Sequence, residues 1–425
     1  MIRLLQISDI HFHSFSGDGE DDYANMRERL FDDLDYVREN LGPIDTVLIC
    51  GDIAFSGKKD EYDIAKDFIK RTLVKLTAGG VEPKVFMVPG NHDKDRGYYE
   101  ETRYLLNKAL LTEKQQEGNS FFNKIKSKEE ETLKILYSPF AEYNNVASIY
   151  SSADQVAESM IGGQSVKDKR VYCQRTIKQL GEYTVSLIGL NSALCCDQYD
   201  FSIKEPEKSH SLFLPKVAYN QVIHKNEIFV SVMHHPLKDF ILHGDKIQQK
   251  FDNLYKVQLF GHIHKQSSFV DNAIKIYSGA FQPDEQDEQE YFPVYNIISL
   301  DVEGSNLKVA IKSRKWDGTK FVNYTDGSVT QTISLEPIDT WSDTDKENAE
   351  VQKQEAENMD KRYKVQKLFM DCSERKRDSI MKEYSFVSDK SKNEIAKAVL
   401  FLRKVEQDGK LDELEQKIAQ YGRSV

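Results

Sequence analysis

The 425-residue sequence predicts an α/β protein that is followed by a small all-α domain. Through the first half of the chain, runs of Val, Ile and Leu alternate with segments of helical periodicity. Such runs are typical of strands that are buried on both faces and connected by helices. Beyond Trp341 the sequence turns polar and helical, and a chain of this length exceeds one ordinary domain.

The elements of the α/β part follow one another in a regular order. Helices are predicted at 23–40 and 61–76, where apolar residues recur every three or four positions. Charged, mostly helical sequence at 97–182 interrupts this order, and we interpret it as an insertion or cap. Strands are predicted at 2–8, 45–52, 84–90, 184–191, 228–235, 257–264, 274–279, 294–302 and 307–316.

The end of the chain carries three amphipathic helical patterns. The first begins at Val365, the second starts at a capping box over 391–394, and the third contains Leu411, Leu414 and Ile418. Together they predict a bundle of roughly 60 residues, near the lower size for independent folding. The expected domains are therefore 1–340, a charged linker at 341–362 and a helical bundle at 363–425.

Charge is distributed unevenly along the chain. Residues 343–425 contain 18 basic and 18 acidic side chains, so the whole net charge of −11 falls on residues 1–342. Such an acidic body lacks the electrostatic footprint with which proteins grip a long phosphate backbone. A small phosphorylated substrate attracted by bound cations remains compatible with it.

Composition also predicts a cytoplasmic protein. No apolar run approaches the roughly 18–20 residues that span a bilayer, so no membrane association is expected. The first residues lead directly into a strand-like segment and do not resemble a signal peptide. Five cysteines without regular spacing fit a reducing compartment.

Several predicted strands end in residues that can bind metal. A single histidine at a strand end is usually a hydrogen-bonded core residue, but five such ends along one chain indicate a metal site. Carboxylates and imidazoles together suit manganese, iron, zinc and similar divalent ions. The strand-end residues are Asp9, His11, Asp52, Asn91, His92, His234, His235, His262 and His264.

The order D-x-H, G-D, G-N-H-D, H-H-P and G-H-x-H resembles the calcineurin-like metallophosphoesterase superfamily over roughly residues 1–300. The resemblance implies a four-layer α-β-β-α sandwich with two divalent metal ions at the strand ends. Such a pair of ions polarises phosphate oxygens and acidifies a water near neutral pH. One ion would take Asp9, His11 and His264, and the other Asn91, His234 and His262, with Asp52 bridging both.

The remaining polar residues of these motifs are expected to have roles other than direct metal binding. The resemblance implies that His92 is a catalytic non-ligand that stabilises the transition state or protonates the leaving oxygen. Asp93 either orients His92 or caps the following helix, and His235 is expected behind the ligands. His13 and His243 either contact substrate or are solvated loop residues.

Departures from the family pattern narrow the substrate. Phosphoprotein phosphatases of the superfamily follow Gly-Asp with a further Asp and an Arg, whereas Phe55 and Ser56 occupy this stretch here. The H-H-P form is more similar to the phosphodiesterase branch. We therefore expect a phosphodiesterase that acts on a nucleotide or a nucleic-acid end with Mn²⁺, or with Fe, Zn, Ni or Mg. A DNA or RNA nuclease that acts with a partner, and a scaffold with a vestigial metal site, are the alternatives.

The stretch "FLRKVEQDGKLDELEQKI" (401–418) resembles the death-fold-like, effector-associated adaptor domains of bacterial conflict proteins. This resemblance covers the tail alone. It implies a protein partner that binds residues 363–425 and a role as effector in bacterial antiviral defence or signalling. The alternative is a helical lid that packs on the catalytic body.

Overall fold

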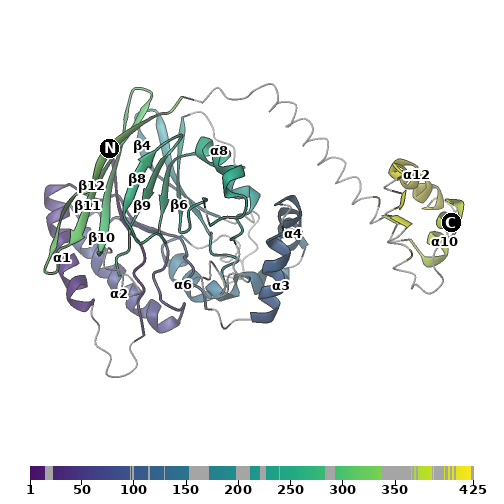
Figure 1. Ribbon diagram of the computed structural model, residues 1–425, viewed down its shortest axis with the longest axis horizontal. Coiled ribbons are helices and arrows are strands. Elements are labelled where there is room, and N and C mark those ends of the chain that lie inside the picture. Colours follow the sequence, from purple (N-terminus) through teal and green to yellow (C-terminus); the bar gives the residue numbers. More distant parts are fainter. Residues whose placement is uncertain are drawn as a thin grey trace. The chain divides into compact units, whose positions relative to one another are not determined.

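The computed structural model divides into two compact units, Met1–Pro337 and Ile338–Val425 (Figure 1). The predicted linker at 341–362 lies outside the described residues. The structure describes residues 1–14, 23–95, 97, 100–112, 115–128, 130–152, 172–197, 211–220, 226–238, 240–282, 292–336, 365, 368–369, 372–384, 386, 397, 401–402, 404–405 and 408–422.

Two six-stranded sheets form the centre of the first unit. In the first sheet the order is β12 (Phe321–Ser334), β11 (Asn306–Trp316), β10 (Val294–Glu303), β1 (Ile2–Ile7), β2 (Thr46–Ile49) and β3 (Lys84–Met87). In the second it is β4 (Tyr172–Leu180), β5 (Tyr183–Leu190), β6 (Glu227–Met233), β7 (Tyr255–Phe260), β9 (Ile274–Tyr277) and β8 (Ser267–Val270). β1, β2 and β3 are parallel to one another, as are β5, β6, β7 and β9.

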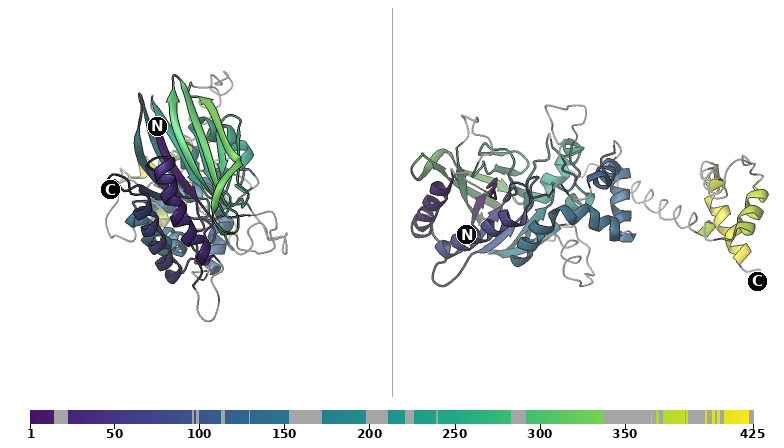
Figure 2. Two further views of the ribbon diagram at one scale, coloured as in Figure 1. Left: turned by 90° about the vertical axis from the view of Figure 1, so that its left-hand side faces the viewer. Right: turned by 90° about the horizontal axis from the view of Figure 1, so that it is seen from below.

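Alternate side chains of each central strand enter different cores, which explains the continuous apolar runs. Leu48 of β2 joins a core with residues of the second sheet, whereas its neighbours Val47 and Ile49 pack with the helices. Helices α1 (Ala24–Asn40, purple in Figure 2) and α2 (Lys59–Leu76) cover the first sheet. Helix α8 (Gly244–Leu254) packs beside the second sheet. The predicted α-β-β-α layering is therefore confirmed.

The segment predicted as a helical insertion at 97–182 is only partly helical. It contains α3 (Glu100–Leu110), α4 (Gln115–Lys128), α5 (Glu130–Tyr137) and α6 (Ala141–Ile149). Its last residues instead form β4, so the insertion ends earlier than expected. β4, β8 and β12, the strands that sequence analysis missed, all lie at sheet edges. Edge strands expose part of their side chains, so their sequences are too polar to show a buried-strand pattern.

The second unit is helical and has an apolar core of its own. Its elements include α10 (Glu374–Glu383) and α12 (Leu411–Gly422). Leu414 and Ile418 of α12 are buried in this core. The core residues are Val365, Phe369, Ile380, Met381, Phe401, Leu402, Val405, Leu414 and Ile418.

Every helix in the described part of the chain is too short or too polar to span a lipid bilayer.

Candidate metal centre

The side chains predicted as metal ligands come together with His92 where the central strands of the two sheets end. We call this group the strand-end cluster. It follows the carboxyl ends of β1, β2, β3, β6 and β7. Among the described residues, ligand atoms lie within 4.8 Å of one another in four triads. The triads are Asp9–His11–His264, Asp9–Asp52–His234, His11–Asp52–His92 and His234–His235–His262. The cluster comprises Asp9, His11, Asp52, Asn91, His92, His234, His262 and His264.

The carboxylate of Asp52 lies at the centre of the cluster. Its Oδ2 atom is 3.0 Å from Nε2 of His234 and 3.5 Å from Nε2 of His11. Its Oδ1 atom accepts the backbone N–H of His92 at 2.7 Å, which fixes the plane of the carboxylate. Oδ1 of Asp9, in turn, lies 3.5 Å from Nε2 of His264. Asp52 is thus shared by two groups of potential ligands.

While the imidazoles are neutral, three buried atoms of the cluster have no hydrogen-bond partner, namely Asp9 Oδ1, His11 Nε2 and His234 Nε2. Buried polar atoms are almost always satisfied, so such an accumulation needs an explanation. All three atoms belong to residue types that bind divalent ions, and they face one another across the same small space. The residues present therefore fit a metal centre.

Outer hydrogen bonds orient the two buried imidazoles. Nδ1 of His11 donates to the carbonyl oxygen of Gln282 at 2.9 Å, and Nδ1 of His234 donates to that of Cys50 at 2.8 Å. Because a carbonyl oxygen only accepts, each ring carries its hydrogen on Nδ1 when neutral. Each Nε2 then presents its lone pair toward Asp52, as a metal ligand requires.

The comparisons with known proteins agree with this geometry. A family model for calcineurin-like phosphoesterases matches residues 2–266, which is more than half of the chain.

The chain belongs to the calcineurin-like phosphoesterase family. It is therefore a metal-dependent hydrolase of phosphate esters. No curated protein matches the sequence of this chain significantly.

Similar solved structures have low sequence identity and low TM-scores. Wild-type Vps29 from Entamoeba histolytica in complex with Zn²⁺ is 13% identical with a TM-score of 0.30, over 79% of this chain and 100% of that chain. Purple acid phosphatase from yellow lupin seeds is 12% identical with a TM-score of 0.39, over 78% and 53%. An uncharacterised protein from Streptococcus pneumoniae, described as a predicted phosphoesterase, is 11% identical with a TM-score of 0.29, over 78% of this chain and 98% of that chain.

Backbone strain marks the cluster of this phosphoesterase. Asp9, His11, Asp52 and His262 have φ values of 53°, 50°, 52° and 60°, in the left-handed region that non-glycine residues rarely adopt. Strain of this kind persists where surrounding structure enforces it, commonly at functional sites. Gly90 allows the close packing, because a Cβ atom there would lie 2.1 Å from Oδ1 of Asp52.

The histidines of the cluster differ in pKa because they lie at different positions relative to the charge of Asp52. Burial alone would lower the pKa of His11 and of His234, but the adjacent Asp52 raises both values to about 9. His262 behaves in the opposite way, because burial and the neighbouring His234 lower its pKa to about 4. In the metal-free phosphoesterase, the two imidazoles beside Asp52 are therefore cationic at neutral pH and His262 is neutral.

Asn91 is oriented by a chain of hydrogen bonds through His235 and Ser192, which we call the relay. Its Oδ1 atom accepts a hydrogen bond of 3.1 Å from Nε2 of His235. Burial, with His262 and His234 nearby, holds the pKa of His235 well below its usual value, so the ring is neutral. With its hydrogen on Nε2, Nδ1 accepts the hydroxyl of Ser192 at 2.9 Å. His235 thus lies behind Asn91, in line with the role expected for it.

Asp93 fills neither of the two roles proposed for it. Its Oδ1 atom accepts the backbone N–H groups of Ile53 and Ala54 and the hydroxyl of Tyr62, at 3.1, 3.0 and 2.8 Å. Its Oδ2 atom accepts the N–H of Gly90 at 2.9 Å. The carboxylate therefore joins the loops after β2 and β3, which carry Asp52 and Asn91.

Lys94 continues this bracing and was not singled out in the sequence. Its ammonium group is buried and donates to the carbonyl oxygens of Leu194 and Cys196, at 2.8 and 2.7 Å. The loop that it holds also carries Ser192, which orients His235. A charged residue next to the G-N-H-D motif was the available signal, but its partners lie about 100 positions further along the chain.

His92 is held with its ring beside that of His11, the two ring planes inclined at 67°. The ring centroids are 4.8 Å apart. Nδ1 of His92 donates to the carbonyl oxygen of Phe55 at 2.7 Å, so this atom keeps its hydrogen and proton exchange falls to Nε2. Of the two other histidines noted in the sequence, His13 stacks on Phe55, whereas His243 precedes α8 and belongs to none of the triads.

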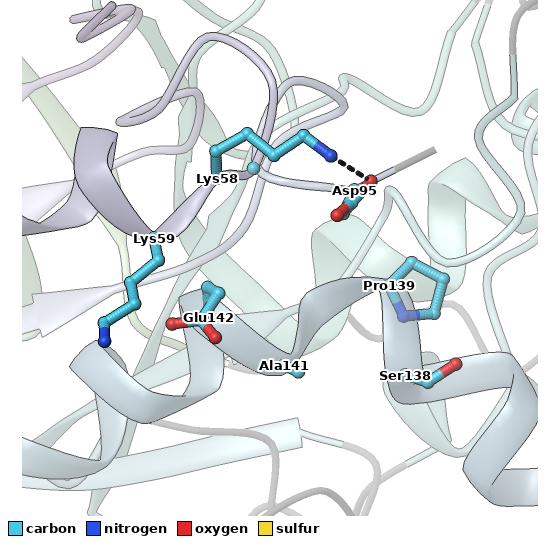
Figure 3. A pocket seen from close by; sticks show the side chains of 8 residues that line it. Lys58, Lys59, Asp95, Ser138, Pro139, Ala141 and Glu142 are labelled. Carbon is cyan, nitrogen blue, oxygen red and sulfur yellow. Dashed lines mark ion pairs between the residues drawn. The ribbon is translucent and has the colours of Figure 1, made fainter. Parts of the chain in front are cut away.

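A separate hollow of about 210 Å³ lies beside the turn after His92 (Figure 3). Lys58 and Asp95 form an ion pair of 2.8 Å at this hollow. Its two lysines and two carboxylates balance in charge, and its residues do not include any member of the strand-end cluster. They are Gly57, Lys58, Lys59, Asp95, Ser138, Pro139, Ala141 and Glu142.

Proposed function

We propose that the chain is a phosphodiesterase with two divalent ions at the strand-end cluster, preferentially Mn²⁺. The observation that carries this proposal is the position of Asp52, whose Oδ2 atom faces both His11 and His234. A carboxylate shared in this way is suited to bridge two ions. Asp9, His11 and His264 would complete one set of ligands, and Asn91, His234 and His262 the other.

Bound ions would supply Lewis acidity to the phosphate and acidify a water. The protein's own contribution is to hold the ligands rigidly and to donate a proton to the leaving group. Asp93 and Lys94 fix the loops, and the carbonyl oxygen of Phe55 fixes the ring of His92 through Nδ1. When the ring is protonated, Nε2 can donate that proton to the oxygen of the departing alcohol.

A diester is favoured over a monoester by the residues that follow Asp52. A monoester carries an additional negative charge, which a cationic side chain usually neutralises. Ile53 and Ala54 are buried and apolar, and the hydroxyl of Ser56 is committed to Glu61 at 2.6 Å. Phe55, the remaining residue of this stretch, offers an uncharged ring.

A panel of substrates tests the proposal. With Mn²⁺ present, bis(p-nitrophenyl) phosphate, cyclic nucleotides and dinucleotides should be hydrolysed faster than p-nitrophenyl phosphate. Single- and double-stranded DNA and RNA address the alternative of a nuclease that acts with a partner. Metal-loaded protein that hydrolyses none of these esters would favour the scaffold with a vestigial site.

We further propose that residues 363–425 bind a protein partner that belongs to a bacterial defence or signalling system. Two features support this: the resemblance at 401–418, and an apolar core of the second unit that needs no catalytic residue. The apolar face formed by Leu411, Leu414 and Ile418 does not serve as the docking surface in this proposal, because Leu414 and Ile418 are buried within the unit.

Truncation after Pro337 tests the assignment of the second unit. The shortened chain should hydrolyse a small diester at a near-normal rate and should lose any partner that co-purifies with the full chain. Aggregation, or loss of activity on small diesters, would favour a lid instead.

A further inference from the structure

Two aromatic side chains, His13 and Phe55, lie next to the strand-end cluster. Their ring centroids are 3.9 Å apart with an angle of 30° between the planes. The ring of Phe55 is also 5.2 Å from that of His92. Phe55 is partly buried and His13 is exposed, so a continuous aromatic surface extends from His92 to solvent. We call His13 and Phe55 the ring pair.

The ring pair is held by the same backbone contacts that hold His92. The N–H of Phe55 donates to the carbonyl oxygen of Phe12 at 3.1 Å, and its own carbonyl oxygen accepts from Nδ1 of His92 at 2.7 Å. Phe12 and Ala54 also form a β-bridge. The loops that carry Asp52 and His13 are therefore tied together, and the rings keep a defined position relative to His92.

The chemistry of this surface suits a flat, uncharged aromatic group. Ser56, the polar residue that follows Phe55, donates its hydroxyl hydrogen to Glu61. Recognition beside the phosphate therefore depends on ring faces rather than on a charge. Stacking of a nucleobase on an aromatic side chain strengthens binding by roughly 5- to 150-fold and tolerates any base, because every base has a π-face.

We propose that the ring pair is a stacking shelf for the nucleobase on the leaving-group side of the scissile phosphate, with His13 as its outer surface. This inference rests on the proposed phosphodiesterase function, in which His92 faces the leaving oxygen. Because the ring of Phe55 lies 5.2 Å from that of His92, a nucleoside that departs as the leaving group can place its base against the ring pair. The substrate class is then a diester of a nucleoside, such as a dinucleotide or a strand end, rather than an alkyl diester.

A pair of matched substrates tests the shelf. A thymidine dinucleotide is compared with one whose leaving-side base is absent, and kcat/KM is measured for both with Mn²⁺. The intact dinucleotide should be favoured by roughly 5- to 150-fold in the wild-type protein. His13→Leu should remove most of this preference, whereas His13→Phe should retain it. Phe269→Leu, which removes an exposed aromatic ring on β8, is the control and should leave the preference unchanged.

A binding measurement separates failure of the shelf from failure of the proposed function. Calorimetric titration of the metal-loaded protein with adenosine 5′-monophosphate and with ribose 5-phosphate requires no turnover. Tighter binding of the nucleotide that His13→Leu abolishes would support the shelf even if no diester is cleaved. Cleavage of diesters without any base preference would overturn the shelf and leave the phosphodiesterase intact. Equal binding of both phosphates by the wild-type protein would also overturn it.

Discussion

The strand-end cluster has a buried half and a partly exposed half. Asp9, His11, Asp52 and His234 are at most 3% exposed, and three of them carry polar atoms without a hydrogen-bond partner. Asn91, His92, His262 and His264 are partly exposed. The buried half can be stable only with its charges compensated, whereas the other half can meet a substrate. Metal retention and substrate chemistry should therefore be separable by mutation.

The largest effect is expected at the centre of the buried half. Asp52→Asn removes a charge shared between His11 and His234. The protein should therefore lose bound metal, and its activity should fall on the order of 10³-fold. Elemental analysis and turnover of bis(p-nitrophenyl) phosphate measure the two effects, and circular dichroism checks the fold. Asp95→Asn is the control, since Asp95 pairs with Lys58 outside the cluster. Two metals per chain with near-normal turnover in Asp52→Asn would refute the bridging assignment.

The partly exposed half should respond differently to mutation. His92→Ala should leave the metal content unchanged and slow esters with poor leaving groups by roughly 10²–10⁴-fold, because the departing oxygen then lacks a proton donor. The nitrophenyl ester, whose leaving group needs little help, should slow much less. Equal losses on both esters, accompanied by loss of metal, would place His92 with the buried half instead.

The difference between the halves also explains how far the sequence could predict the site. A buried strand that ends in a polar residue can be recognised in the sequence as an apolar run followed by that residue. This pattern precedes Asp9, His11, Asp52, His234 and His262. Hydrogen-bond partners are not visible in this way, because they come from loops distant in the chain. The Ser192–His235–Asn91 relay joins residues up to 144 positions apart. Asp93 was misassigned for this reason, since Ile53, Ala54 and Tyr62, three of its four donors, lie between 31 and 40 residues earlier.

The same reasoning applies to the fold. Central strands such as β2 could be predicted because both of their faces are buried. β8 is a four-residue edge strand with mainly exposed side chains, and its sequence resembles that of a loop. The left-handed backbone of Asp9 and Asp52 has no sequence signal either, because it is enforced by tertiary packing.

A smaller effect is expected at the boundary between the halves. Ser192→Ala removes the hydroxyl that selects the His235 tautomer, so Asn91 loses its fixed orientation. Metal affinity of one of the two sites should fall by roughly 10–100-fold, as is usual for residues behind the ligands. Competition with a chelator measures it. Ser278→Ala, at another buried serine, should have no such effect, and an unchanged affinity in Ser192→Ala would remove the relay from the metal site.

The last prediction concerns pH and distinguishes the halves directly. Without metal, the pKa values of His11 and His234 are raised to about 9, whereas that of His262 is lowered to about 4. A protonated imidazole cannot bind metal, so each ion must displace a proton from the buried half but none from His262. Metal affinity should therefore rise about tenfold per pH unit for each displaced proton, and level off near pH 9. Calorimetry at pH 7 in buffers of different ionisation enthalpy counts the protons released. His234→Ala should lower the count by about one, and His262→Ala should leave it unchanged. The reverse result would mean that the charge of Asp52 does not control the buried half.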